Sequence, residues 1–238
     1  TTSGVNDIIN KPYIHISDNA VMNSYIFKSC FINKVKHLIF LSCTTMYKSS
    51  NKPLKEYEFN PLKDINKKYF GVAHTKIYSE KMCEFYSRIC KTKFSVIRHS
   101  NIYGPYDKFN LKNSHVFGST ITKVMKSKSK IKIWGNGSEK RDFLYIDDLV
   151  EFIEFLIKKQ KHNFELINCG LGKSISVKDL VKKIIKVSKK KLFIEYDLKR
   201  PTIRTNITIS CSKAKNNYGW VAKTSIEEGI YKTINWWK

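Results

Sequence analysis

Residues 98–115 read R-H-S-N-I-Y-G-P-Y-D-K-F-N-L-K-N-S-H, and this stretch decides how the chain is interpreted. It follows residues 93–97, K-F-S-V-I, whose alternating, β-rich pattern predicts a buried strand. Gly104 and Pro105 end the strand, and a polar loop then leads to His115, which we expect to open a helix. Open α/β sheets bind ligands at the carboxyl ends of their strands. The loop is therefore the first candidate for a binding site.

A second unit of the same kind occupies residues 131–153, I-K-I-W-G-N-G-S-E-K-R-D-F-L-Y-I-D-D-L-V-E-F-I. It predicts a strand, a glycine turn, a second strand and then a helix, with Asp147 as the helix N-cap. Further on, S-K-A-K-N-N-Y-G-W predicts a short helix that Gly219 ends. Strands that alternate with helices in this way predict an α/β fold.

Composition narrows the class of protein. With 238 residues and 42% apolar content, the chain can bury the core of one domain or slightly more. No apolar run approaches the roughly 20 residues of a membrane span, and the N-terminal T-T-S-G lacks the features of a signal peptide, so we expect a cytoplasmic protein with no membrane partner. The six cysteines form no C-x-x-C pair, which favours reduced thiols over a zinc site.

The formal net charge of +24 raises the possibility of nucleic-acid binding. The lysines of the chain are spread over nearly every segment, often at single outward positions of predicted helices, as in residues 177–186. This spread favours a lysine-rich solvated surface, so nucleic acid is an unlikely partner. A basic field would equally attract a doubly anionic diphosphate.

The motif R-H-S-N-I-Y-G-P at residues 98–105 resembles the R-x-x-N-x-Y-G-P signature of the extended short-chain dehydrogenase/reductases, the NAD-dependent epimerase/dehydratase family. The continuation N-S-H-V is most similar to the GDP-L-fucose synthase branch. W-G-N-G with R-D-F and D-D, and later R-P-T-I-R before S-K-A, extend the resemblance over essentially the whole chain. It implies a partial Rossmann-type cofactor domain in residues 1–105. Residues 106–238 would then form mainly a small α/β substrate-binding region, with some strands and helices returning to the Rossmann sheet.

The resemblance also indicates what this sequence lacks. Residues 19–30 predict a helix capped by Ser17 or Asp18, which corresponds to the helix after the fourth strand of the family. The G-x-x-G-x-x-G turn that binds the dinucleotide pyrophosphate is absent from this sequence, so we expect the chain to be part of a longer protein. The cofactor is expected to be NADP or NAD, and the choice between them stays open.

Residues 37–41, H-L-I-F-L, form an apolar strand that we expect in the middle of a parallel sheet. The residues after it resemble the family's S-S-x-x-x-Y stretch, in which a Ser or Thr four residues before the tyrosine hydrogen-bonds the sugar oxygen. Counting back from Tyr47 gives Cys43, a poor donor, so Ser42 or Thr44 is an alternative. By the same resemblance, Ser42 and Arg98 are candidates for cofactor binding.

The family's Tyr-x-x-x-Lys pair has no regular counterpart here. In that pair the lysine binds the nicotinamide ribose and lowers the pKa of the tyrosine, which passes a proton to or from the sugar. One alignment makes Lys76 the lysine but leaves valine at the tyrosine position, and another pairs Phe70 with His74. We therefore expect Tyr69 and Lys76 to act together, which requires a non-helical lead-in over residues 69–73; Tyr69 as an ordinary aromatic anchor is the alternative.

His115 matches the acid that the GDP-L-fucose synthase pattern uses in epimerisation, opposite a cysteine. Thr45 stands at that cysteine position here, so redox at C4 is better supported than epimerisation at two carbons. For the nucleotide diphosphate sugar, the resemblance implies a binding set of Asn101, Lys123, Trp134, Arg141 and Arg204.

These residues together predict an NAD(P)-dependent nucleotide-sugar epimerase/reductase, similar to GDP-L-fucose synthase. Two alternatives stay open: a UDP- or dTDP-sugar 4-epimerase or dehydratase, and a catalytically impaired member of the fold that binds nucleotide or RNA. The dehydratase ranks lower because T-T-M-Y offers no carboxylate. Residues 78–87 could supply one helix of a four-helix homodimer contact.

Overall fold

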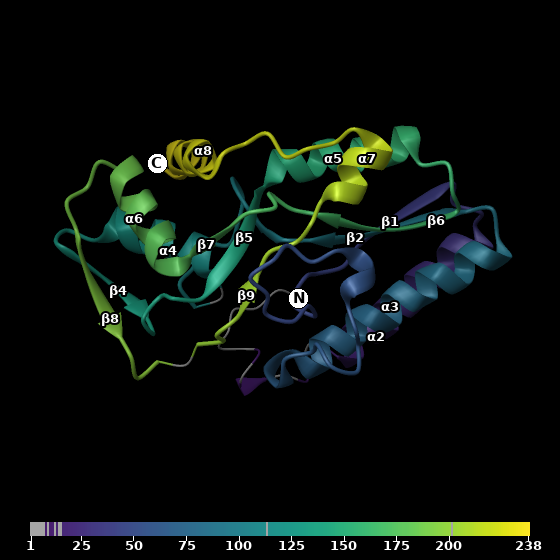
Figure 1. The fold of residues 1–238 in the computed structure, drawn as a ribbon, viewed down its shortest axis with the longest axis horizontal. Helices are drawn as coiled ribbons and strands as arrows, with labels where there is room; N and C mark the ends of the chain where they lie inside the picture. Colours follow the sequence, from purple (N-terminus) through teal and green to yellow (C-terminus); the bar gives the residue numbers. More distant parts are fainter. Residues whose placement is uncertain (1–7, 9, 12, 14–15, 113, 201) are drawn as a thin grey trace.

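The computed structural model describes residues 8, 10–11, 13, 16–112, 114–200 and 202–238. Three parallel strands form one sheet in the order β1 (His37–Leu41), β2 (Lys93–His99), β6 (Phe164–Cys169). Helices α2 (Ser17–Ile32) and α3 (Phe70–Ile89) run along one face of this sheet, and α5 (Ile146–Lys159) and α7 (Ser212–Tyr218) lie on the other (Figure 1). The predicted α/β fold is confirmed.

A second group of elements follows the organising loop. Strands β4 (Lys130–Trp134) and β8 (Phe193–Asp197) pair in parallel. Strand β5 (Lys140–Tyr145) pairs with β3 (Asn101–Tyr103), β7 (Ser174–Ser176) and β9 (Asn206–Ile207). Helices α4 (Val116–Lys126), α6 (Val177–Val187) and α8 (Ile226–Trp237) gather at the same end of the molecule as β4 and β8 (Figure 1). The predicted domain boundary at residue 105 stays a prediction.

Each group has its own apolar core. Phe94 and Val96 of β2 pack between the sheet and α3, whereas Leu144 and Phe152 pack with Trp220 on the other face. The largest core joins β4, β5, α4, α6 and α8 around a nest of aromatic rings, in which the centroids of Tyr103 and Phe117 are 4.1 Å apart. This packing fixes the strands whose carboxyl ends carry the candidate site.

Several element predictions are confirmed. The first strand spans His37–Leu41, and His115 is the N-cap residue of α4. Gly219 ends α7 with φ +71°, a left-handed conformation that favours glycine. Among the described strands, β2 lies between β1 and β6 and is buried along most of its length, and the expected central position of the first strand stays a prediction.

Two predicted helix caps are also wrong. Ser17 lies inside α2, Asp18 lies in its first turn, and Ile16 is the N-cap residue with no side-chain cap. Asp147 lies in the first turn of α5, after the N-cap residue Tyr145. In both helices the carboxylate is placed near the positive end of the helix dipole without capping it.

All six cysteines are free thiols. Among the described residues, no group of His, Cys, Asp or Glu side chains is arranged to hold a metal ion. Within the same residues, no helix combines the length and apolar character that crossing a bilayer requires.

Candidate active site

The end of β1 presents two of its four hydroxyl and thiol side chains. Cys43 and Thr45 are partly exposed, and Sγ of Cys43 lies 3.0 Å from Oγ1 of Thr45. Ser42 and Thr44 are buried, with 1% and 5% of their surfaces exposed. Ser42 and Cys43 directly follow the strand, where successive side chains point to opposite sides, and residues 44–47 form a turn closed by the bond from the Tyr47 N–H to the Thr44 carbonyl oxygen. Of the three alternatives for the sugar-oxygen contact, only Cys43 is therefore partly exposed.

Helix α3 brings a lysine to this strand end. Nζ of Lys76 donates a hydrogen bond to the carbonyl oxygen of Leu41, at 2.8 Å. Burial lowers the pKa of Lys76, while Cys43 and Glu80 raise it. His99, at the end of β2, lies close enough for the charge of Lys76 to lower its pKa further, in addition to the larger effect of burial.

Tyr69 precedes this helix. It ends a 3₁₀ turn, Lys67–Tyr69, whose N-cap residue Asn66 accepts a hydrogen bond from the backbone N–H of Lys68. Burial raises the pKa of Tyr69; Arg141 opposes that shift and Cys43 adds to it. Cys43 affects the pKa of both Tyr69 and Lys76 through its charge, which places the three residues in the same region of the molecule. We call Cys43, Thr45, Tyr69 and Lys76 the thiol cluster.

The long non-helical lead-in expected for Tyr69 is not found. Helix α3 begins at Phe70, so only Tyr69 of residues 69–73 lies outside it. The alternative register with Phe70 and His74 places both side chains outward, since Phe70 is 63% exposed and its ring lies 4.4 Å from that of His74. In the register with Tyr69 and Lys76, by contrast, Tyr69 is buried and Lys76 bonds to the end of β1.

Three of the other predicted residues are held by the chain itself. Arg98 is buried and forms an ion pair with Glu80, and the hydroxyl of Ser42 donates to the same carboxylate. Asn101 donates from Nδ2 to the carbonyl oxygen of Asp142, at 3.0 Å. Contacts of Ser42 and Arg98 with a cofactor, and of Asn101 with a substrate, stay predictions.

His115 takes part in none of the contacts described above for the thiol cluster. Its side chain is exposed at the start of α4 and makes no capping hydrogen bond. Loss of hydration lowers its pKa, the carboxylate of Asp107 opposes this, and Lys108 lowers it slightly further. The imidazole is therefore available to a ligand, and its role in epimerisation stays a prediction.

A hollow of about 310 Å³ lies beside Trp134. Lys123 and Arg200 both approach the indole ring, with their charged groups 5.8 and 5.3 Å from its centroid. The remaining walls of this Trp134 hollow are Ser127, Lys132 and Asp197. Lys123 and Trp134 were predicted as substrate ligands; Arg200 and Lys132 were not, although the K-R-P run beside Arg204 was a signal for Arg200.

The two predicted arginines lie near the same segment. Arg141 donates to the carbonyl oxygens of Ile203 and Thr205, at 3.0 and 3.1 Å. Arg204, between them, is exposed. The segment that carries Arg204 is thus held by Arg141 at one end and follows Arg200 of the Trp134 hollow in the sequence. Exposed arginines such as Arg200 and Arg204 suit an anionic ligand.

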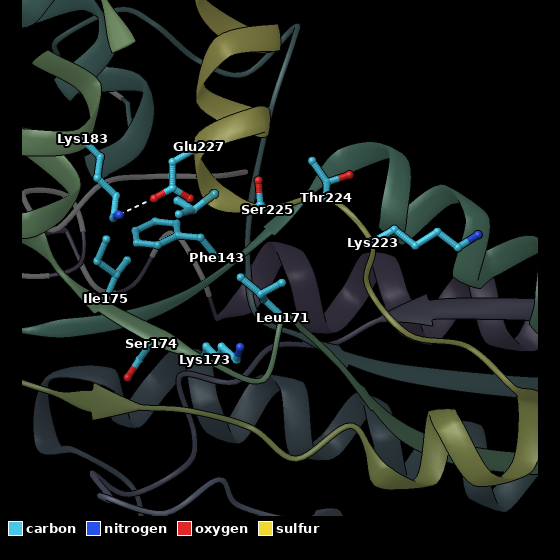
Figure 2. Close-up of a pocket in the computed structure, with 11 residues that line it drawn as sticks. Phe143, Leu171, Lys173, Ser174, Ile175, Lys183, Lys223, Thr224, Ser225 and Glu227 are labelled. Atoms are coloured by element: carbon cyan, nitrogen blue, oxygen red, sulfur yellow. Dashed lines mark hydrogen bonds and ion pairs between the residues drawn. The ribbon is translucent and has the colours of Figure 1, made fainter. Parts of the chain in front are cut away.

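A larger cavity of about 440 Å³ lies elsewhere, between β5, β7, α6 and the start of α8 (Figure 2). None of the predicted site residues lines it. Two of its lysines are already paired, Lys183 with Glu227 across the cavity and Lys223 with Glu151 of α5. In Figure 2, Lys223 points away from the other lining side chains. The predicted site residues therefore lie outside this cavity.

Residues 1–170 match the family model described as "NAD dependent epimerase/dehydratase family". The chain belongs to this family. It is 30% identical to GDP-L-colitose synthase of Yersinia pseudotuberculosis, over 98% of this chain and 77% of that protein. It is 33% identical to GDP-L-fucose synthase of Sinorhizobium fredii, over 93% of this chain and 71% of that protein.

Solved structures agree with the fold. A UDP-N-acetylglucosamine 4-epimerase from Methanobrevibacter ruminantium superposes with a TM-score of 0.84 at 23% identity, over 98% of this chain and 73% of that one. The predicted Rossmann-type fold and the predicted enzyme class, an NAD(P)-dependent nucleotide-sugar epimerase/reductase, are confirmed.

The described residues fit the nicotinamide end of this family's dinucleotide cofactor. Lys76 uses one of its three N–H donors on Leu41, and the others remain at the carboxyl end of β1, where parallel sheets bind ligands. Cys43 and Thr45 add partly exposed polar groups there. No residue is assigned to the pyrophosphate, since the G-x-x-G-x-x-G turn is not part of this sequence.

Sequence reasoning missed Glu80 and Asp142, both buried carboxylates next to predicted site residues. Glu80 follows Lys76 by one helical turn, and Asp142 follows Arg141. Asp142 accepts hydrogen bonds from the backbone N–H groups of Leu171 and Gly172, at 2.9 and 3.0 Å. Nothing in the one-dimensional pattern distinguishes these acids from surface acids, because their partners come from distant segments.

Proposed function

We propose that the protein acts at C4 of a keto-sugar nucleotide as a GDP-L-fucose synthase-like enzyme. The observation that carries the proposal is the end of β1, where Lys76 donates a hydrogen bond to the carbonyl oxygen of Leu41 and the side chains of Cys43 and Thr45 are partly exposed. The names of the two relatives, GDP-L-fucose synthase and GDP-L-colitose synthase, support a GDP-linked sugar.

Each member of the cluster has a proposed role. A bound nicotinamide cofactor supplies the hydride. Lys76 binds its ribose, and Tyr69, whose pKa is raised by burial, holds a proton on its phenol oxygen at neutral pH and donates it to the sugar oxygen. Cys43 binds that oxygen, with Thr44 as the weaker candidate because it is buried. His115 assists any epimerisation.

The nucleotide end is assigned to the basic residues beyond the cluster. We propose that Lys123 binds the diphosphate, that Trp134 lines the sugar-nucleotide pocket and Arg204 binds its nucleotide end, and that Arg141 and Asn101 contact the phosphate or the sugar. The cations around the Trp134 hollow, including Arg200, support this assignment, since a diphosphate carries two negative charges.

The first test is oxidation of reduced nicotinamide dinucleotide by the full-length protein with GDP-4-keto-6-deoxymannose. Tyr69→Phe should lower kcat by roughly 10²-fold or more, the range for loss of a general acid. Tyr57→Phe is the matched control, because Tyr57 is 78% exposed on a surface turn and should leave kcat unchanged.

The alternatives predict different results. Interconversion of a UDP- or dTDP-hexose at C4, without turnover of the GDP-sugar, would replace the proposed substrate with that of a 4-epimerase. RNA binding that weakens steeply with salt, with no turnover of any nucleotide sugar, would favour a binding protein on this scaffold.

A further inference from the structure

We propose that Glu80 is a positioning residue for the thiol cluster, because its carboxylate joins the strand end that carries Cys43 to the helix that carries Lys76. The positioning role of Glu80 is independent of the proposed function; only an effect of Glu80 on turnover would rest on that function. Glu80 touches neither substrate nor cofactor in this account; it acts through Ser42 and Lys76.

Two neighbouring contacts attach α3 to β1. Lys76 and Glu80 lie four residues apart, so they share one face of the helix. Lys76 donates to the carbonyl oxygen of Leu41 at 2.8 Å, and Oγ of Ser42 donates to Oε1 of Glu80 at 2.5 Å. Leu41 and Ser42 are consecutive, and Cys43 follows them. The position of the thiol is thus set by two contacts one helical turn apart.

Arg98 of β2 completes the network from the other side. Its Nε donates to Oε1 of Glu80 at 3.0 Å and its Nη2 to Oε2 at 2.7 Å, a bidentate pair. Both side chains are buried, with 5% and 4% of their surfaces exposed. The Glu80 carboxylate therefore accepts three hydrogen bonds from two strands while it stands on α3.

Further contacts tie the guanidinium to the loop over the sheet. Nη1 of Arg98 donates to the hydroxyl of Tyr47 and to the carbonyl oxygen of Glu56, both at 3.1 Å. The hydroxyl of Tyr47 donates in turn to Oδ1 of Asn168 on β6, at 2.8 Å. Strands β2 and β6, helix α3 and the segment that follows β1 therefore meet in one buried polar network.

A buried ion pair is a poor source of net stability, because desolvation offsets most of its attraction. Packed apolar side chains would stabilise this place as well, whereas only the carboxylate can accept from both Ser42 and Arg98, so the contacts favour a role in position and charge. The charge role has a definite direction. Burial lowers the pKa of Lys76, and Glu80, together with Cys43, raises it. Glu80 thereby helps to keep the ammonium protonated.

The test replaces Glu80 by glutamine, which keeps the shape and removes the charge. Competitive acetylation across pH, read by mass spectrometry of the Lys76 peptide, reports the protonation of Lys76 without any substrate. Cys43 and Glu80 raise the Lys76 pKa and His99 lies beside the lysine, so all three face the titrating group. In Glu80→Gln we expect the midpoint to fall, with at least a threefold faster acetylation at pH 8.

Glu84→Gln is the matched control. Glu84 stands one turn further along α3, where it pairs with Lys81 and Arg88 at the surface, so the variant removes the same charge from the same helix. Its Lys76 acetylation should match that of the unsubstituted protein. An equal shift in both variants would overturn the proposal, because the effect would then come from the net charge of the helix.

Loss of one partner leaves Arg98 buried without its counter-ion, so Glu80→Gln can fail to fold. Glu80→Gln combined with Arg98→Met removes both charges and restores packing. In this double variant we expect the same threefold increase at Lys76. An unchanged Lys76 midpoint in a folded variant of either kind would overturn the role of Glu80.

The strand contact is tested separately by Ser42→Ala, which removes the hydrogen bond and leaves the charge of Glu80. We expect the rate of Cys43 alkylation by iodoacetamide to change at least threefold while the Lys76 midpoint stays fixed. An unchanged Cys43 rate would refute the link from Glu80 to the thiol. Neither readout needs turnover, so inactivity of the unsubstituted protein toward GDP-4-keto-6-deoxymannose would reject the proposed function alone.

Discussion

At the scale of single residues, the chemistry of the thiol cluster depends on which side chains the end of β1 exposes. The sequence analysis left three candidates in S-C-T-T for the sugar-oxygen contact, Cys43, Ser42 and Thr44, and in the structure Cys43 and Thr45 are partly exposed while Ser42 and Thr44 are buried. The pattern alone could not say which pair is buried. That choice is made by Glu80 and the sheet, which take Ser42 and Thr44 into the interior.

This division leads to a prediction for Cys43. Cys43→Ala should lower kcat/KM at least tenfold, because it removes the hydrogen-bonding group next to Tyr69 and Lys76. Cys43→Ser should keep or raise activity, since a hydroxyl is a better donor than a thiol. Cys90→Ala is the control, because Cys90 lies at the far end of α3 and its thiol bonds only to the backbone of Tyr86. The measurement is kcat/KM of the three variants. Equal losses of kcat/KM in Cys43→Ser and Cys43→Ala would contradict a hydrogen-bonding role for Cys43.

Asp142 gives a prediction for pH. Burial raises its pKa to about 6, above the value of 3.8 for an exposed aspartate, so the folded state holds the proton more tightly than the unfolded state. The stability from this group is therefore complete below about pH 4 and is lost as the pH rises through 6, by roughly 3 kcal/mol at most. Asp142→Asn removes this dependence.

Urea unfolding of both proteins between pH 4 and 7 measures the effect. The free energy of unfolding of the unsubstituted protein, relative to Asp142→Asn, should decrease over that interval. A difference that stays constant with pH would show that the carboxyl titrates alike in both states.

At the scale of elements, α3 shows what the periodicity of the sequence predicts correctly and what it does not. The helix was predicted, and its Lys76 is close to the strand end. Tyr69 and Lys76 are seven residues apart, which in a regular helix would separate them by about 10 Å along the axis. Because α3 begins at Phe70, only Tyr69 itself departs from that geometry. Tyr69 ends the 3₁₀ turn Lys67–Tyr69, whose cap by Asn66 was not among the sequence predictions.

We therefore expect Asn66→Ala to affect both stability and turnover. It removes the hydrogen bond to the N–H of Lys68, at a cost of about 1 kcal/mol, and loosens the turn that carries Tyr69. Ser176→Ala removes a comparable cap from α6, far along the chain from Tyr69. Both variants should lower the free energy of unfolding, and only Asn66→Ala should lower kcat. Equal kcat values would mean that the turn does not position Tyr69.

Helix starts were the weakest part of the sequence interpretation, and α5 shows the reason. The Asp-Asp pair looked like a capping signal. In the structure, both oxygens of Asp148 accept backbone N–H groups of Lys223 and Thr224, at 3.1 Å each. A carboxylate near the start of a helix can accept hydrogen bonds from the N–H groups of its own helix or from those of a distant segment. The tertiary fold decides between the two.

At the scale of the whole molecule, the fold was predictable because long apolar strands, glycine turns and family motifs agree along the chain. The contacts between segments were not. Arg141 donates hydrogen bonds to carbonyl oxygens of residues 202–205. The backbone N–H of Ser50 donates to the carbonyl oxygen of Asn206, which lies more than 150 positions away in the sequence. Such pairings have no periodic signature, so the candidate site was predicted as a set of residues and not as an arrangement.

At the scale of the whole molecule, the outer surface of α2 and α3 predicts a contact with a second copy of the protein. Helices α2 and α3 pack side by side on the sheet, and their outer surface carries exposed apolar side chains: Val21, Met22, Tyr25, Ile26 and Ile32 of α2 with Tyr78, Phe85 and Ile89 of α3. Patches of this extent mark interaction sites. We predict that two copies associate through these helices as a four-helix contact.

Light scattering after size exclusion measures this directly. The unsubstituted protein should have twice the mass of the 27.8 kDa chain. Tyr25→Glu with Phe85→Glu should halve that mass, because two carboxylates in each copy would be buried against apolar side chains. Phe193→Glu, on the exposed edge of β8, is the control and should leave the mass unchanged. A monomer at micromolar concentration in the unsubstituted protein would rule out the contact, and a dimer that survives the paired substitution would place it on another face.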